Sequence, residues 1–127
     1  MNSMCNEVLG KKNWIIPDCE LPQPGEGVAK GHESVIIVND SDVEAEIEVS
    51  LYFVDKEPHT GIRWTVEPKR VKCFRMNNLE HMGGFEVPFE TQYAMKISSS
   101  TPIVLQYGRL DNTQANLAFY TTLGYSN

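Results

Sequence analysis

The chain lacks the features that mark a secreted, zinc-binding or membrane-spanning protein. Its 127 residues include three cysteines, Cys5, Cys19 and Cys73, and an odd number without a CxxC pair predicts neither a disulfide framework nor a zinc ribbon. No stretch approaches the roughly 18 consecutive apolar residues that a membrane-spanning helix needs. The N-terminal residues contain no apolar core of the kind found in signal peptides. These absences together predict a reduced, cytoplasmic protein.

The chain also has few basic residues. Lysines and arginines number 11 against 17 aspartates and glutamates, which gives a formal net charge of −6. Proteins bind nucleic acid mainly by neutralising phosphates with lysine and arginine, so this balance argues against a nucleic-acid partner. Four basic residues do crowd one short segment, and a local basic surface is therefore the weaker alternative: Lys69, Arg70, Lys72 and Arg75.

No motif of a familiar catalytic or cofactor site is present. The chain contains no GxSxG, no GxGxxG and no phosphate-binding loop. His32 and Glu33 begin HESVI, which lacks the second histidine of HExxH and falls within a strand pattern. His32, His59 and His81 have no metal-ligand spacing, and Cys73 lies in a strand pattern where a small buried side chain is expected. We therefore predict no metal, no cofactor and no catalytic residue.

One pair of carboxylates leaves an enzymatic alternative open. Asp55 and Glu57 flank Lys56 in a turn, where carboxylates ordinarily cap the backbone and meet solvent. Paired carboxyls can also perform acid–base chemistry. A sugar-active enzyme needs two of them about 5–10 Å apart across a cleft, and Asp111 is the candidate for the second. We predict a protein that is not an enzyme and keep the sugar-active enzyme as an alternative.

Alternating and β-branched segments dominate the sequence. In Glu44–Val54, apolar residues at every second position alternate with polar residues, mostly glutamates, which is typical of a strand with one face in a core. About eight short strands predict a single all-β domain over residues 1–127, an antiparallel β-sandwich or barrel, with a flexible N-terminus at 1–12. Besides 44–54, the expected strands are 13–16, ending at Pro17, 33–39, 62–66, 70–76, 92–98, 103–110 and 117–124, with a long loop at 77–91 and a short helical turn near 111–115.

Two of the expected strands are apolar on both faces. They are Val35–Val38 and Ile103–Leu105. A strand in a monomeric sandwich usually keeps one face in water, so a second apolar face needs a cover. A closed homo-oligomer is the common solution, and loops or the edge of the second sheet are the alternative. The pattern favours the oligomer.

The segment Pro102–Asp111, read as PIVLQYGRLD, predicts the wall of a polar site. Because side chains alternate along a strand, Tyr107, Arg109 and Asp111 share the face that begins with apolar residues, and this face changes from dry to charged. Arginine offers a planar fork for carboxylates, phosphates and vicinal hydroxyls. Two interpretations of Arg109 and Asp111 stay equal. They bind a ligand, or they form an ion pair within one chain or between subunits.

Five segments, taken in order, resemble the family of soluble sensory rhodopsin transducers. The resemblance implies a jelly-roll β-sandwich, a homotetramer and a cytoplasmic signalling role. It also implies that members without a rhodopsin receptor bind small molecules, with sugars proposed as ligands. The segments that carry it are GHESVIIVN (31–39), YFVDKEP (52–58), TVEPKR (65–70), FRMNNL (74–79) and PIVLQYGRLDNTQA (102–115).

The resemblance points to a set of site residues and to a function. The chain departs from the family pattern at Tyr107, Thr113 and Asn78, where the pattern has histidine, arginine and aspartate. The leading hypothesis is a non-enzymatic ligand-binding or signalling module for a small polar molecule such as a sugar. An adaptor that relays a signal from a membrane receptor is the first alternative, and the sugar-active enzyme is the second. The predicted ligand-binding residues are Arg109, Asp111, Gln106, His32, Glu33, Arg75, Asp55 and Glu57.

Overall fold

The computed structural model describes residues 7–25, 30–111 and 118–127, all of them in strands, turns or loops. The expected helical turn falls outside these ranges except for Asp111, which ends a strand. The strands are β1 (Lys11–Glu20), β2 (His32–Asn39), β3 (Ala45–Phe53), β4 (His59–Val66), β5 (Arg70–Arg75), β6 (Gln92–Asp111), β7 (Ala118–Thr122) and β8 (Tyr125–Ser126).

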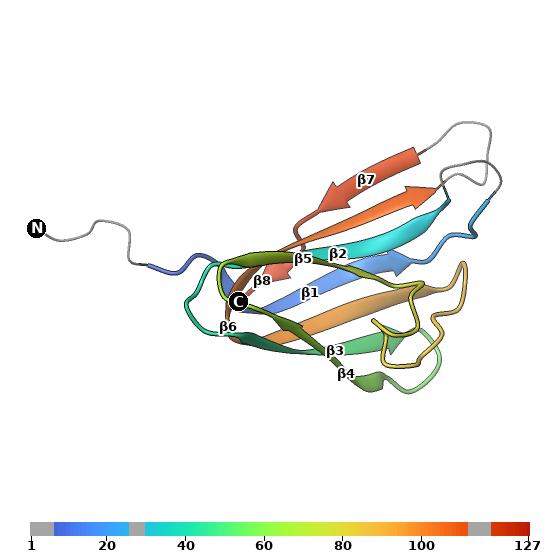
Figure 1. Cartoon of the computed structure of the whole chain (residues 1–127). Coiled ribbons are helices and arrows are strands. Elements are labelled where there is room, and N and C mark those ends of the chain that lie inside the picture. Colours follow the sequence, from blue (N-terminus) through green and yellow to red (C-terminus); the bar gives the residue numbers. More distant parts are fainter. Residues whose placement is uncertain (1–6, 26–29, 112–117) are drawn as a thin grey trace, which may run out of the picture.

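The eight strands form two layers of antiparallel sheet that share β6. The first layer has the order β4-β3-β6-β1-β8, and the second layer pairs β5 with β2, β2 with β6, and β6 with β7. In Figure 1, β4 lies at the outer edge of the first layer and β7 at the outer edge of the second. The predicted all-β sandwich is confirmed. No helix in the described part of the chain is long and apolar enough to cross a membrane.

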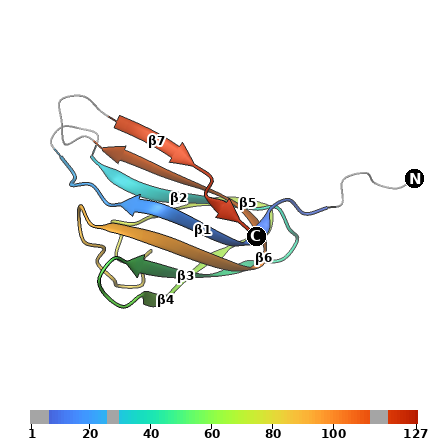
Figure 2. The ribbon, with the colours of Figure 1, turned by 180° about the vertical axis from the view of Figure 1, so that it is seen from behind.

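Strand β6 is one long strand where the sequence predicts two. Its first half, up to Ser99, pairs with β3, and its second half, from Val104, pairs with β2 and then also with β7. Figure 2 shows β6 passing from one layer to the other. The expected break at 99–102 is a bend between the layers, where Pro102 has no β3 or β2 partner that needs its missing N–H.

Strand β1 also runs further than the sequence predicts. The expected end at Pro17 is a shift of register instead, between the pairs Ile16–Met95 and Cys19–Tyr93. A β-bulge places an extra residue opposite its partner strand, and proline is tolerated there because the ladder is already interrupted. The extension carries Glu20 to the end of the sandwich.

The core lies between the two layers and follows the predicted alternation. In β3, Ile47, Val49 and Leu51 are buried, whereas Glu46 and Glu48 are exposed and Ser50 is half-buried. Trp64 stacks on Phe74 with ring centroids 4.2 Å apart, which joins the two layers. Burial of each such large apolar side chain stabilises the fold by about 1.5–3 kcal/mol.

One face of the second layer points away from this core and carries a group of apolar residues. We call it the outer apolar face and define it by Ile36, Val38, Val71, Val104 and Phe119. Val38, Val71 and Phe119 are 41%, 63% and 65% exposed, and Ile36 and Val104 are half-buried. The second face of the doubly apolar strands is therefore open to solvent in the single chain. Cys73 lies opposite Ile36 on this face and is exposed, contrary to the expectation that it is buried.

Candidate functional site

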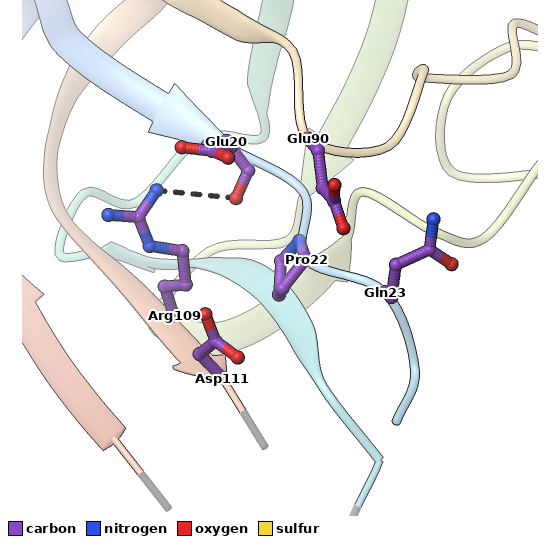
Figure 3. Close-up of a pocket in the computed structure, with 6 residues that line it drawn as sticks. All are labelled: Glu20, Pro22, Gln23, Glu90, Arg109 and Asp111. Carbon is purple, nitrogen blue, oxygen red and sulfur yellow. Dashed lines mark hydrogen bonds between the residues drawn. The ribbon is translucent and has the colours of Figure 1, made fainter. Parts of the chain in front are cut away.

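A polar pocket lies at the end of the sandwich where β1 and β6 both finish. Its volume is about 230 Å³. Figure 3 shows the side chains of Glu20, Glu90, Arg109 and Asp111 around Pro22, with Gln23 at one side. Three carboxylates and one guanidinium thus line a cavity of the size of a small polar molecule. Its residues come from the end of β1 and the segment after it, the end of β6 and the loop before β6.

Arg109 is the cation of this pocket. Its Nη1 donates a hydrogen bond to the backbone carbonyl of Glu20 over 3.3 Å, so the half-buried guanidinium is tied to the end of β1. Asp111 follows two residues later on the same face of β6. Arg109 also lines a second depression of about 460 Å³ together with Pro17, Asp18 and Thr122. The guanidinium therefore borders two depressions from one fixed position.

The loop before β6 brings Glu90 into the pocket through an unusual backbone conformation. Glu90 has φ of 56°. A non-glycine residue in this left-handed region costs about 1–3 kcal/mol, so the surrounding structure must hold it there. The Glu90 N–H donates to the carbonyl of Leu21 over 2.8 Å, and Leu21 also forms a β-bridge with Phe89. The loop is thereby fastened to the segment that follows β1.

A buried carboxylate, Glu33, lies behind this end of β1. Its side chain has no exposed surface. Oε1 accepts a hydrogen bond from the Tyr93 hydroxyl over 2.6 Å, and Oε2 accepts one from the Glu20 N–H over 2.8 Å. Oε2 also accepts a hydrogen bond from the Tyr107 hydroxyl. Three donors thus converge on a single buried charge, the arrangement that a buried ionised carboxyl requires.

Burial governs the electrostatics of this cluster. Desolvation raises the pKa of Glu33, and the hydrogen bonds from Tyr107, Tyr93 and Glu20 and the charge of Arg109 oppose this only in part. Burial first, and then the negative charge of Glu33, raise the pKa of Cys19, Tyr93 and Tyr107. None of these four groups is among the residues lining the pocket. The groups with shifted pKa values therefore support the pocket from behind.

The structure brings together only part of the predicted ligand-binding set. Arg109 and Asp111 line the pocket, and Glu33 contacts it through the backbone of Glu20. The other five predicted residues do not line it. Gln106, His32 and Arg75 lie on the outward side of the second layer, and Asp55 and Glu57 are exposed in the turn between β3 and β4.

Sequence reasoning missed the pocket residues outside β6. Glu20 was missed because the sequence predicts that the first strand ends at Pro17. Glu90 was missed because a glutamate gives no indication in the sequence that its backbone is left-handed. The inward direction of Glu33, in contrast, follows from its phase with Val35 and Ile37 along β2. Among the described residues, no group of three or more histidines, cysteines, aspartates and glutamates is placed to hold a metal ion.

Fold and site together define an antiparallel β-sandwich with a polar pocket where the layers meet. The family model described as "Anabaena sensory rhodopsin transducer" matches residues 9–126, and the chain belongs to that family. The solved structure of the Anabaena sensory rhodopsin transducer is similar, with a TM-score of 0.71 and 35% identity over 80% of this chain and 97% of that one. A structure described as Thermotoga maritima 1070 has a TM-score of 0.83 and 28% identity, covering 93% of this chain and 96% of that one. No curated protein matches the chain.

Proposed function

We propose that the protein is a non-enzymatic ligand-binding module in signalling, which binds a small hydroxyl-rich molecule such as a sugar. The observation that supports this most is the polar pocket, in which Arg109 is fixed to the Glu20 carbonyl beside three carboxylates. Vicinal hydroxyls can donate to carboxylates and accept from a guanidinium at the same time. A cavity of about 230 Å³ suits a single sugar ring more than a larger ligand.

The charge of the pocket narrows the class of ligand. Glu20, Glu90 and Asp111 outnumber the single guanidinium of Arg109. A ligand with its own carboxylate meets repulsion there, whereas a neutral sugar meets none and an ammonium group is attracted. The proposal therefore favours neutral sugars and amino sugars over sugar acids.

Three ligands of one ring type test the proposal. Isothermal titration with glucose, glucosamine in its ammonium form and glucuronate compares neutral, cationic and anionic forms. We expect measurable binding of glucose and glucosamine, weaker or no binding of glucuronate, and loss of binding by at least about tenfold in Arg109→Ala, since a hydrogen bond to a charged group is worth about 1.5–3 kcal/mol.

Arg63→Ala is the matched control for this experiment. Arg63 is an exposed arginine on β4 and does not line the pocket. It should bind the sugars as the wild type does. Equal binding by the wild type and Arg109→Ala, or binding of none of the three ligands, would count against the proposed site.

The proposal includes assembly of the chain into a homotetramer. The outer apolar face supports this, because Val71, Val38 and Val104 lie side by side across β5, β2 and β6, and Val38 and Val71 are exposed. Monomeric proteins rarely expose a contiguous apolar surface of this kind, and a second copy of the chain is the cover we propose. We also propose a cytoplasmic location, because a reducing compartment keeps the exposed Cys73 thiol on this surface reduced.

An adaptor role beneath a membrane receptor is the second candidate. It is favoured by the 35% identity to the Anabaena sensory rhodopsin transducer, whose name assigns it a rhodopsin. In this case the protein works through its surface, so Arg109→Ala would leave the interaction intact. Recovery of a membrane protein with the intact oligomer from solubilised membranes distinguishes the adaptor from a ligand-binding module.

The sugar-active enzyme depends on Asp55 or Glu57 lying close to Asp111. Asp55 and Glu57 are exposed in the β3–β4 turn, and neither lines the pocket with Asp111. Glycosidases need both carboxyls on one cleft, about 5–10 Å apart. The geometry therefore does not support an enzyme that uses Asp55 or Glu57 together with Asp111.

A further inference from the structure

We infer that Glu33 is a positioning residue for the polar pocket, and that ligand binding there is coupled to the protonation state of its carboxyl group. The inference rests on the proposed ligand-binding function. It also changes the role of Glu33 from a ligand contact to a group that acts through the end of β1.

Glu33 joins the two layers of the sandwich next to the pocket. It belongs to β2 in the second layer, whereas the Tyr93 hydroxyl comes from the half of β6 in the first layer. The Glu20 N–H comes from β1, also in the first layer, and the Tyr107 hydroxyl from the half of β6 paired with β2. One carboxylate thus holds together three stretches of chain that belong to different layers.

Glu20 connects Glu33 to the pocket. Its N–H donates to the Glu33 carboxylate, its carbonyl accepts from Arg109, and its side chain lines the pocket. Arg109 is also the residue directly opposite Glu33 in the pairing of β2 with β6. A change at the Glu33 carboxylate therefore reaches both the backbone and the cation of the pocket.

Protonation of Glu33 removes part of this support. The ionised carboxylate accepts all three hydrogen bonds, whereas the protonated form has an O–H of its own that needs an acceptor. A tyrosine hydroxyl can turn to accept that proton, but the Glu20 N–H can only donate. Protonation also removes the attraction between Glu33 and Arg109. The pocket is consequently best ordered when Glu33 is ionised, and binding weakens as the carboxyl becomes protonated.

Glu33 is the fully buried carboxyl group of this cluster. The ionisable or charged residues that face it are Cys19 and Glu20 from β1 and Tyr93, Tyr107 and Arg109 from β6. Burial raises the pKa of Cys19 and of both tyrosines, so these stay neutral, and Arg109 keeps its charge. Burial also raises the pKa of Glu33 itself, which moves its titration toward neutral pH.

The test follows the titration by NMR in the intact protein without ligand. The Glu33 side-chain carboxyl carbon, the Glu20 amide and the Arg109 Nε–Hε group are observed over a pH series. We expect one common midpoint, above the ordinary range for glutamate. In Glu33→Gln the shared inflection should disappear from Glu20 and Arg109. In Tyr107→Phe the midpoint should rise, because the ionised form loses a donor.

An exposed glutamate provides the control. Glu48→Gln, on the solvent side of β3, should leave the shared midpoint unchanged. If Glu20 and Arg109 show no inflection at the midpoint of Glu33, the inference is overturned, whatever the stability of Glu33→Gln. A merely structural carboxylate would alter stability without linking these three resonances.

Glucose, which carries no titrating group in this range, then tests the consequence for binding. Between one pH unit above and one below the midpoint, the ionised fraction falls about tenfold, and the affinity should fall by about the same factor. Glu33→Gln should show no such dependence. Glucose binding that needs Arg109 but ignores pH overturns the inference and leaves the proposed function standing. If glucose fails to bind at either pH, the proposed function is what fails, and the NMR titration alone decides the coupling.

Discussion

Glu33 is an acidic side chain with no exposed surface, and its neighbours only partly offset the cost of burying its charge. Removing a carboxylate from water is expensive unless donors replace the lost hydration. Two tyrosine hydroxyls and one backbone N–H do so here, and Arg109 adds a favourable charge. Desolvation still exceeds these contributions and raises the pKa of Glu33. An ionised Glu33 at neutral pH therefore lowers the stability of the folded state.

This cost predicts how stability depends on pH. The pKa of Glu33 in the folded state is raised above its ordinary value of 4.5. Between these two pKa values the folded state keeps a proton that the unfolded state has lost. The stability from Glu33 is complete below the ordinary value and is lost as pH rises through the folded-state pKa. The loss is about 1.4 kcal/mol for each pH unit that separates the folded-state pKa from the unfolded-state pKa. Glu33→Gln cannot ionise, so this component of the pH dependence should vanish.

Urea unfolding of the wild type and Glu33→Gln across this pH range checks the prediction. The advantage of the wild type over the variant should shrink as pH rises, whereas Glu48→Gln should keep the wild-type slope. A difference between wild type and Glu33→Gln that is constant with pH would show that the pKa of Glu33 is not raised. Stability and the order of the pocket thus respond to pH in opposite directions.

At the scale of the element, the start of β1 depends on a glycine. Gly10 has φ of 111°, and a Cβ atom there would lie 2.2 Å from the backbone oxygen of Ile103. Any side chain at this position both strains the backbone and collides with β6, which cannot give way as a flexible side chain would. The close approach of the chain to β6 therefore needs glycine at residue 10.

Gly10→Ala should consequently destabilise the protein more than Gly61→Ala. Gly61 also has a positive φ, of 88°, but a Cβ atom added there would meet nothing within 4 Å, so alanine adds backbone strain alone. We expect a loss of about 1–2 kcal/mol for Gly61→Ala and about 2–5 kcal/mol for Gly10→Ala, measured by urea unfolding. Equal losses for the two variants would show that the contact with Ile103 relaxes easily.

The predictions from the sequence succeed for elements with an uninterrupted period and fail where proline interrupts it. The alternation in β3 indicates its buried and exposed faces correctly, because one face packs on the core throughout. Pro17 is expected to end one strand and the link 99–102 to separate two others, but a bulge accommodates Pro17 and a bend between layers accommodates Pro102. The missed extension of β1 is the reason that Glu20 is absent from the predicted site.

The site was predictable only along the strand that carries it. Arg109 and Asp111 followed from the change from apolar to charged residues within one strand. The partners of Glu33 did not, since Tyr93 lies 60 residues and Tyr107 74 residues further along the chain. Contacts at such separations depend on how strands are ordered in the layers, which alternation along a single strand does not specify.

At the scale of the whole molecule, the proposed ligand binding and the proposed assembly involve different residues. The pocket residues lie where β1 and β6 end, whereas the outer apolar face lies on the outward side of the second layer. None of the residues that define the outer apolar face lines the pocket. We therefore expect a substitution on the outer apolar face to leave the lining of the pocket unchanged.

A charge on the outer apolar face should therefore break the assembly and spare the pocket. Val71→Glu places a carboxylate on β5 at the proposed contact between copies, where burying it without a partner is unfavourable. Light scattering coupled to size exclusion should show a tetramer for the wild type and a smaller species for Val71→Glu. Val54→Glu is the matched control, because Val54 is 80% exposed in the β3–β4 turn and lies outside the outer apolar face. It should remain tetrameric, and Val71→Glu should still bind glucose. A tetramer that persists in Val71→Glu would mean that the chains meet through a different surface.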